Sequence, residues 1–132
     1  MTESEMYQRF LKPEFNKQGF FYCRFEQPKI PDVFISCYGR VLWAELKVVN
    51  KLQKIIKPKW RPGQLAWLKN HERYNPESTC LILYYHDWIY YLPPKLTYKE
   101  EDLLCQKEHY FQILLNPWTM TSCPNFQKNV NE

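Results

Sequence analysis

Apolar positions recur with two different periods along the chain, and these periods predict its elements. From Met6 to Phe15 they recur at helical spacing, which predicts a helix over residues 2–18. Pro13 interrupts this pattern, so a kink or a break is expected there. The aromatic-rich residues 20–25 are typical of a strand. The N-terminal part is therefore predicted to be a helix followed by a strand.

Two strongly β-prone runs follow, and they predict a tight hairpin. Residues 31–37 and 40–49 are separated only by the turn signal Tyr38-Gly39. The register that follows pairs Cys37 with Arg40, Phe34 with Trp43 and Asp32 with Glu45. One face of this hairpin is wholly apolar and the other is mixed, which predicts a core on one side and a partly covered cleft on the other.

The second half of the chain contains three further elements and a tail. Pro62 is expected to open a helix that runs to about residue 73. Residues 79–85 and 88–92 predict a strand pair, and a capping-box pattern precedes a predicted helix over about residues 98–115. A polar tail follows. The order helix, three strands, helix, two strands, helix predicts an α/β (α+β) domain, with a central mixed sheet flanked by helices.

Composition agrees with one folded domain over residues 1–132. Hydrophobic residues make up 45% and aromatic residues 17% of the sequence. The N-terminus has no apolar segment typical of a signal peptide, and no apolar run is long enough to cross a membrane, so a cytoplasmic location is expected, in the host cytoplasm if the chain is viral. The five cysteines include no C-x-x-C pair, which favours reduced thiols over a zinc site.

Charge is distributed unevenly. The net charge is +4, and no Asp or Glu occurs from Leu46 to His71. That stretch contains the residues that we name the basic patch: Lys51, Lys54, Lys57, Lys59 and Arg61. Such a cluster is expected to contact phosphates in a salt-dependent way, although a solvated loop remains an alternative.

The mixed face of the hairpin carries the candidate chemistry. Asp32 and Glu45 are expected to oppose each other, with Lys47 on the same face. Two opposed carboxylates repel unless a cation lies between them, and Mg²⁺ or Mn²⁺ prefers such oxygen ligands. The backbone carbonyl of Leu46 is a candidate third ligand. Lys47 would hold or help deprotonate a water, or stabilise developing charge. The alternative is a surface charge pair screened by Lys47, which the apolar neighbours of Glu45 disfavour.

These residues resemble a known group of nucleases. Ile30-Pro31-Asp32 followed by Ala44-Glu45-Leu46-Lys47 resembles the PD-(D/E)xK nuclease superfamily. The segment from Arg61 to Leu68 is similar to the glutamine-bearing helix of the virus-type replication-repair (VRR-NUC) branch, and to junction-resolving nucleases of phages and archaea. The resemblance covers roughly residues 3–92. It implies a restriction-endonuclease-like core.

The resemblance also implies roles for individual residues. Asp32 and Glu45 would be metal ligands, Lys47 the catalytic lysine and Gln64 an accessory site residue, although Gln64 could also be an ordinary polar residue of a helix. Members of this superfamily often carry an acid on the first helix that completes the metal site. Glu3 lies on the apolar face of the predicted helix, so it is preferred over Glu5 for this role in catalysis and metal binding.

The sequence therefore predicts a Mg²⁺- or Mn²⁺-dependent DNA endonuclease without a small-molecule cofactor. By resemblance it is structure-selective, similar to a Holliday junction resolvase of phage or microbial recombination and repair. A homodimer follows if two strands must be cut. A restriction enzyme, an RNA endonuclease and an exonuclease are alternatives within the enzymes. A non-catalytic nucleic-acid-binding protein and an inhibitor of host defence are alternatives outside them.

Overall fold

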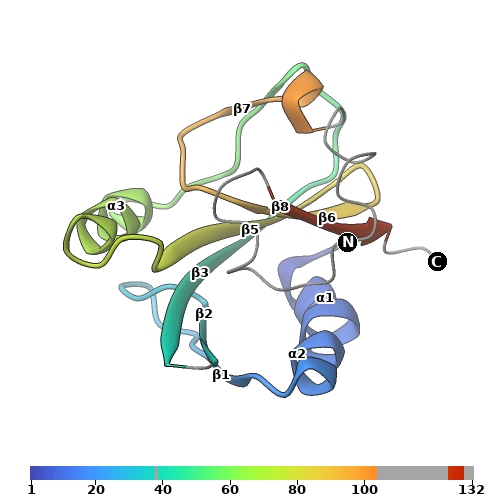
Figure 1. Cartoon of the computed structure of the whole chain (residues 1–132). Helices are drawn as coiled ribbons and strands as arrows, with labels where there is room; N and C mark the ends of the chain where they lie inside the picture. The colour runs from blue at the N-terminus through green and yellow to red at the C-terminus, as the bar shows by residue number, and fades with distance from the viewer. Residues whose placement is uncertain (38, 104–124, 130–132) are drawn as a thin grey trace.

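A six-stranded mixed sheet forms the centre of the molecule. The computed structural model describes residues 1–37, 39–103 and 125–129. The strand order is β1-β2-β3-β5-β6-β8, and only β3 and β5 pair in parallel among these neighbours (Figure 1). The strands are β1 (Phe21–Arg24), β2 (Val33–Cys37), β3 (Arg40–Val49), β5 (Thr79–Tyr85), β6 (Trp88–Leu92) and β8 (Asn125–Asn129). The predicted mixed sheet is confirmed.

The N-terminal helical segment covers one face of the sheet. It consists of α1 (Glu3–Met6), a π-helical turn η1 (Tyr7–Leu11) and α2 (Lys12–Gln18). The chain stays helical around Pro13: the π-helical turn ends two residues before the proline, which lies in the first turn of α2. Gly19 ends the segment with φ of 74°, as expected for a left-handed C-cap.

The predicted hairpin has the expected register. Cys37 pairs with Arg40 and Phe34 pairs with Trp43 across β2 and β3. The ladder begins at Val33, however, so the predicted strand pairing of Asp32 with Glu45 is wrong. The backbone carbonyl of Asp32 instead accepts a hydrogen bond from the N–H of Phe25, at 2.8 Å, which draws the start of β2 toward β1.

The opposite face of the sheet is covered by α3 (Gln64–Tyr74) and a small sheet. The small sheet pairs β4 (Ile55–Ile56) with β7 (Tyr98–Lys99). Figure 1 shows these elements above the central sheet and the N-terminal helices below it. β4 lies inside the stretch that contains the basic patch, where the sequence pattern predicts no strand. Its partner strand is more than forty residues away in the chain, so no local pattern indicates the pairing.

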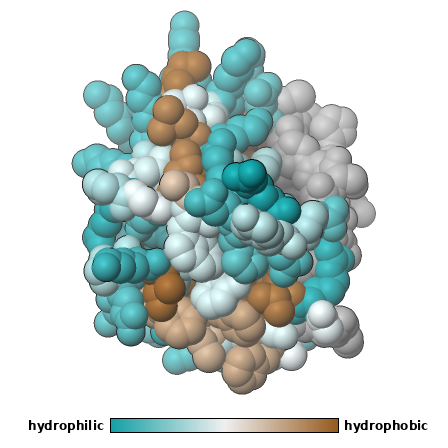
Figure 2. All heavy atoms as spheres, turned by 90° about the vertical axis from the view of Figure 1, so that its left-hand side faces the viewer, coloured by the Kyte–Doolittle hydropathy of each residue, from teal (hydrophilic) through white to brown (hydrophobic). Residues whose placement is uncertain are grey.

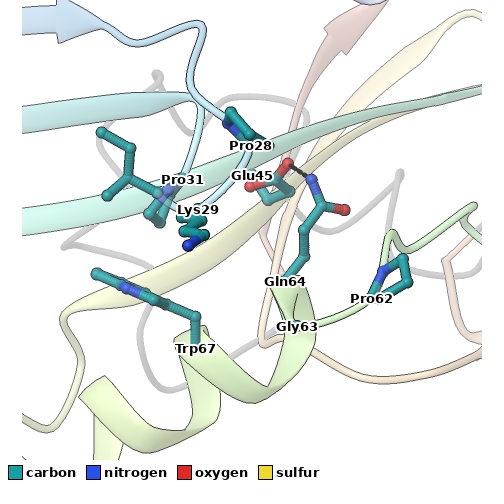
Figure 3. A pocket seen from close by; sticks show the side chains of 9 residues that line it. Pro28, Lys29, Pro31, Glu45, Pro62, Gly63, Gln64 and Trp67 are labelled. Atoms are coloured by element: carbon teal, nitrogen blue, oxygen red, sulfur yellow. Dashed lines mark hydrogen bonds between the residues drawn. The ribbon is translucent and has the colours of Figure 1, made fainter.

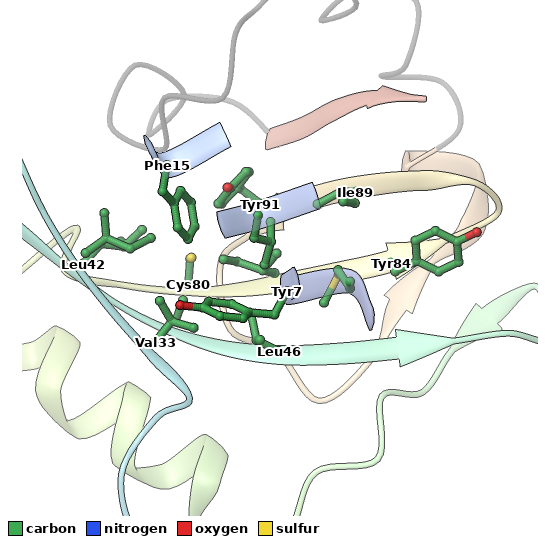
Figure 4. Packing of buried hydrophobic residues seen from close by; sticks show 14 of the residues in the cluster. Tyr7, Phe15, Val33, Leu42, Leu46, Cys80, Tyr84, Ile89 and Tyr91 are labelled. Carbon is green, nitrogen blue, oxygen red and sulfur yellow. The ribbon is translucent and has the colours of Figure 1, made fainter. Parts of the chain in front are cut away.

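Two hydrophobic clusters hold these layers together. The first packs the N-terminal helices on the sheet and includes Phe15, Leu46, Cys80 and Tyr91, all of which converge in Figure 4. The second packs the small sheet on the other face and includes Tyr85. Burial of one large side chain stabilises the fold by roughly 1.5–3 kcal/mol. The sheet is thus buried on both faces, and charged residues at its centre need partners.

The C-terminal part differs from the sequence prediction. Tyr98 pairs with Ile56, and its hydroxyl donates to the carbonyl of Pro93 at 2.7 Å, so Tyr98 and Lys99 are extended and helical residues begin only at Glu100. The rest of the predicted helix, from residue 104, lies outside the described residues. Within the polar tail, β8 adds an edge strand to β6, because backbone pairing needs no apolar side chains.

Within the residues that the structure describes, no helix has the length and apolar character needed to span a membrane.

Candidate active site

The side chains of the predicted site come from four elements. Glu45 and Lys47 lie on β3, where alternation places both on the face toward α3. Asp32 directly precedes β2, and Glu3 is the first residue of α1. Gln64 is the first residue of α3, which starts there because the preceding glycine has φ of 88°, a conformation that favours glycine. The fold thus gathers residues that are far apart in the sequence.

Asp32 and Glu45 lie together although their backbones are not paired. The Asp32 Oδ2 atom accepts a hydrogen bond from the backbone N–H of Leu46 at 2.9 Å, which holds its carboxylate against β3. Burial, together with the charge and side-chain hydrogen bonding of Asp32, raises the pKa of Glu45 to about 8. Glu45 is only 2% exposed, so little water screens this repulsion. The two carboxylates form the acidic pair that the sequence predicts.

Gln64 connects Glu45 to Lys47. Its amide Nε2 donates to Glu45 Oε1 at 2.5 Å, and its Oε1 accepts from Lys47 Nζ at 2.9 Å. The same Oε1 accepts from the backbone N–H of Arg61 at 2.8 Å, which fixes the orientation of the amide. Lys47 is 5% exposed, so its ammonium group is held inside the site rather than in solvent. The sequence predicted these three residues as a group, and the structure brings them together.

Glu3 lies at the same site, and Glu5 does not. Burial raises the pKa of Glu3, and among the charges that act on this pKa those of Lys47, which lowers it, and Asp32, which raises it, have the largest effects. Glu5 is exposed and instead accepts a hydrogen bond from Thr2 Oγ1 at 3.3 Å. The preference for Glu3 over Glu5 therefore agrees with their positions. Its roles in metal binding and catalysis stay predictions.

The donors present fit a divalent cation bound by two carboxylates. Mg²⁺ is commonly held by one or two carboxylates, with water or phosphate oxygens completing its shell. The raised pKa of Glu45 shows that its buried negative charge is poorly compensated, and a cation between Glu45 and Asp32 would remove that cost. No cluster of three or more His, Cys, Asp or Glu side chains suited to a metal occurs among the described residues. Glu3 and the carbonyl of Leu46 as ligands therefore stay predictions.

The basic patch is solvent-exposed. All five of its side chains are exposed, and Arg61 lies near enough to the site to lower the pKa of Glu3. Trp60, which lies between Lys59 and Arg61 of the basic patch, is anchored by its side chain. Its Nε1 donates to the carbonyl of Lys95 at 3.0 Å, and its ring lies 5.8 Å from Lys47 Nζ.

A pocket of about 280 Å³ opens beside Glu45 (Figure 3). It is lined by the loop before β2, by one residue of β3 and by the start of α3 with the two residues before it. The lining residues are Pro28, Lys29, Ile30, Pro31, Glu45, Pro62, Gly63, Gln64 and Trp67. The sequence pattern gives no indication of this pocket or of a role for His71. His71 stacks on Trp67, with centroids 5.1 Å apart and planes at 8°. The spacing of four residues between the two rings is the signal that could have revealed the pair.

The pKa of Glu45 leads to a testable pH dependence. Its carboxyl group keeps its proton in the folded, metal-free chain up to about pH 8, while in the unfolded chain it ionises near 4.5. The unfolded state therefore binds fewer protons in this window, and stability falls as pH rises through it. Urea unfolding in EDTA should show that the free energy of unfolding of the native chain falls by an amount on the order of a few kcal/mol between pH 5 and pH 8. Glu45→Gln has no carboxyl group at this position, so its free energy of unfolding should not show this fall. The exposed control Glu101→Gln should follow the native curve, and parallel curves for all three proteins would contradict the assignment.

Comparison with known proteins supports the fold. No family model matches the chain, and no curated protein matches it. The structure is similar to that of Hjc, a Holliday junction resolvase from the archaeal hyperthermophile Archaeoglobus fulgidus, with a TM-score of 0.56 and 16% sequence identity. The similarity covers 76% of this chain and 86% of that chain. The chain therefore has the restriction-endonuclease-like fold that its sequence predicts.

Proposed function

We propose that this chain is a metal-dependent DNA endonuclease of the PD-(D/E)xK superfamily, close to the VRR-NUC branch. The observation that carries the proposal is the buried Glu45 beside the half-buried Asp32, with Glu45 linked through Gln64 to a buried Lys47. A buried carboxyl group whose pKa is raised, as that of Glu45 is, is costly for stability, and such groups gather at functional sites. The restriction-endonuclease-like fold supports the same conclusion.

The residues present suit phosphodiester hydrolysis. Asp32 and Glu45 would hold Mg²⁺ or Mn²⁺, which, when bound, supplies polarisation of a phosphoryl oxygen and a lowered pKa for a bound water. Lys47 would orient the attacking water or stabilise the charge that develops on the phosphate. Gln64 keeps the Lys47 ammonium group in place through its hydrogen bond at 2.9 Å. Glu3 would act as a further acid at the edge of the site.

Branched DNA is the substrate that the structural likeness favours. The neighbour in the fold comparison is a Holliday junction resolvase, and the exposed basic patch provides charges for phosphate contacts. A homodimer would let two such sites cut two strands. A protein that binds DNA without cutting it is the second candidate, because the basic patch alone would suffice for that activity.

Metal binding tests the proposal without relying on cleavage. Titration with Mn²⁺, followed by electron paramagnetic resonance, should show a bound ion for the native chain and at least about tenfold weaker binding for Glu45→Gln. Glu101→Gln provides a matched control, because its carboxylate is exposed and outside the site. Equal Mn²⁺ binding by all three proteins, or binding by none, would reject a metal site at Glu45.

The basic patch should set the salt dependence of DNA binding. Each phosphate that a lysine neutralises contributes about 0.9 to the slope of log affinity against log salt concentration. Replacing Lys51, Lys57 and Lys59 together by glutamine is expected to reduce that slope by about 2–3. Fluorescence anisotropy between 50 and 300 mM salt measures it, with Lys69→Gln on α3 as the single-charge control (roughly one unit at most). An unchanged slope in the triple variant would show that these residues are only a solvated surface.

A further inference from the structure

We infer that the pocket beside Glu45 holds one unstacked nucleobase of the substrate, with Trp67 as its stacking platform. This inference rests on the proposed function, because it takes the phosphate of that nucleotide to lie at the acidic pair. It adds a substrate class: DNA with an unpaired nucleotide at the cleavage point, such as a single strand, a flap or an open branch point.

The shape and lining of the pocket suit a base. Its volume of about 280 Å³ is walled largely by proline rings, Ile30 and the Trp67 indole. Figure 3 shows the Trp67 ring facing Pro31 and Lys29, with Glu45 and Gln64 at the other side of the pocket. Flat apolar walls with an aromatic ring are typical of sites that stack bases without reading their identity.

Trp67 is held in place before any ligand arrives. One of its faces stacks on His71, whose Nδ1 lies 2.8 Å from Ser78 Oγ. Trp43 packs beside this stacked pair, with its ring centroid 5.5 Å from that of Trp67 and 6.3 Å from that of His71, so it contacts the edge of Trp67 and not its second face. A ring fixed on one face and at its edge offers its other face for stacking without losing rotational freedom on binding. If Trp67 served only to pack the fold, its second face would not need to line a pocket.

Charge around the pocket matches a nucleotide. Lys29 is exposed at its rim, and Lys47 and Arg61 lie near the acidic pair, where the phosphate would be bound. A base lies one sugar away from its phosphate, so a phosphate at Glu45 would place its base beside Glu45, where the pocket is. In a continuous duplex that base is paired and stacked, and extracting it costs a few kcal/mol, a cost that an unpaired nucleotide avoids. Selectivity for unpaired nucleotides follows.

Figure 2 views the molecule from the side on which α3 lies and shows a largely hydrophilic surface. Hydrophobic side chains form a narrow column in the upper part of this face and a broader patch in its lower part, toward β1 and β2. The exposed Phe21 on β1 contacts Phe34, which contacts Trp43, so a row of rings leads from this edge to Trp67. This row of rings contacts Trp67 through Trp43, and Phe21, Phe34 and Trp43 do not line the pocket.

A thermodynamic cycle between the base and the ring tests the inference. The full chain, with Ca²⁺ in place of Mg²⁺ to prevent cleavage, is titrated with a labelled twelve-nucleotide single strand. A series of strands moves one abasic site along the sequence, and each is measured with the native chain and with Trp67→Ala. Trp67→Ala should weaken binding of the intact strand by about tenfold or more. For the native chain, an abasic site at one position of the strand should lower the binding affinity by a similar factor. For Trp67→Ala, an abasic site at that position should lower the affinity almost no further.

Matched variants keep this test decisive if Trp67→Ala unfolds. Trp67→Phe retains a ring and should keep most of the affinity, and Lys29→Ala removes only an exposed rim charge and should weaken single-strand binding a few-fold. Tyr74→Ala removes a side chain that is 87% exposed on the same helix and outside the pocket, and it should bind normally. Binding of a fully paired duplex should be insensitive to Trp67.

The outcomes separate this inference from the proposed function. Three results would refute the base pocket, whether or not the chain cleaves DNA. The first is that no abasic position lowers the affinity, and the second is that the affinity losses from the abasic site and from Trp67→Ala are independent and multiply. The third is that Trp67→Ala weakens duplex binding as much as single-strand binding. If the cycle shows coupling but the native chain with Mg²⁺ or Mn²⁺ cuts nothing, the proposed nuclease function fails and the base pocket stands.

Discussion

Lys47→Met is expected to reduce cleavage by about 10²–10³-fold while leaving metal binding intact. Lys47 Nζ is the buried cation nearest to the acidic pair in the hydrogen-bond network, and it reaches Gln64 at 2.9 Å. Methionine has a similar length and apolar stem, so packing is retained while the positive charge is lost. Gln64 keeps its second donor, the backbone N–H of Arg61, so the amide should hold its orientation.

Single-turnover cleavage at saturating Mg²⁺ measures this loss, and Mn²⁺ titration checks the metal site in the same preparation. Lys69→Met on α3 is the matched control, because that lysine is exposed. A Lys47→Met protein that cuts at the native rate would contradict a catalytic role for Lys47. A variant that loses Mn²⁺ binding as well would show that Lys47 organises the site rather than the chemistry.

Asp32→Asn is expected to abolish both metal binding and cleavage, with a loss of about 10³-fold or more. The variant keeps an oxygen that can accept from the backbone N–H of Leu46, so the contact at 2.9 Å between the loop and β3 should survive. It loses one of the two charges that a divalent ion needs. Because Asp32 also raises the pKa of Glu45, the metal-free variant should lose less stability between pH 5 and pH 8 than the native chain does.

Calorimetric titration with Mn²⁺ and the cleavage assay measure these two effects together. Asp102→Asn is the control, since Asp102 is exposed and lies outside the site. Native-like Mn²⁺ affinity in Asp32→Asn would remove Asp32 from the ligand set. Glu45 and Glu3 would then remain as the candidate carboxylate ligands of the metal.

Local patterns were enough to predict the hairpin and most of the site. The Tyr38-Gly39 turn sets a register that the structure confirms from Cys37–Arg40 to Phe34–Trp43. Alternation then places Glu45 and Lys47 on one face, whatever the rest of the chain does. Gln64 was proposed through resemblance, and its contacts with Glu45 and Lys47 place it at the candidate site. These features depend on neighbours in the sequence or on one short turn.

Features that depend on distant partners were not predicted. Asp32 was expected to continue the strand ladder, but contacts with Phe25 and Leu46 decide its position. Tyr98 was expected to be helical, and its pairing with Ile56 makes it extended. The strand β8 lies in a polar segment, where side-chain periodicity gives no signal of backbone pairing. The pocket is likewise built from three separate parts of the chain, the loop before β2, β3 and the start of α3, so no local pattern could indicate it.

The most direct test of the central claim is a cleavage panel with Mg²⁺ or Mn²⁺. Labelled duplex DNA, single-stranded DNA, a four-way junction and RNA are each incubated with the native chain and with Glu45→Gln. The native chain should cut DNA that contains unpaired or branched positions, and Glu45→Gln should cut none of the substrates. If neither protein cuts any substrate while both bind DNA alike, the chain is a binding protein and the acidic pair has no catalytic role.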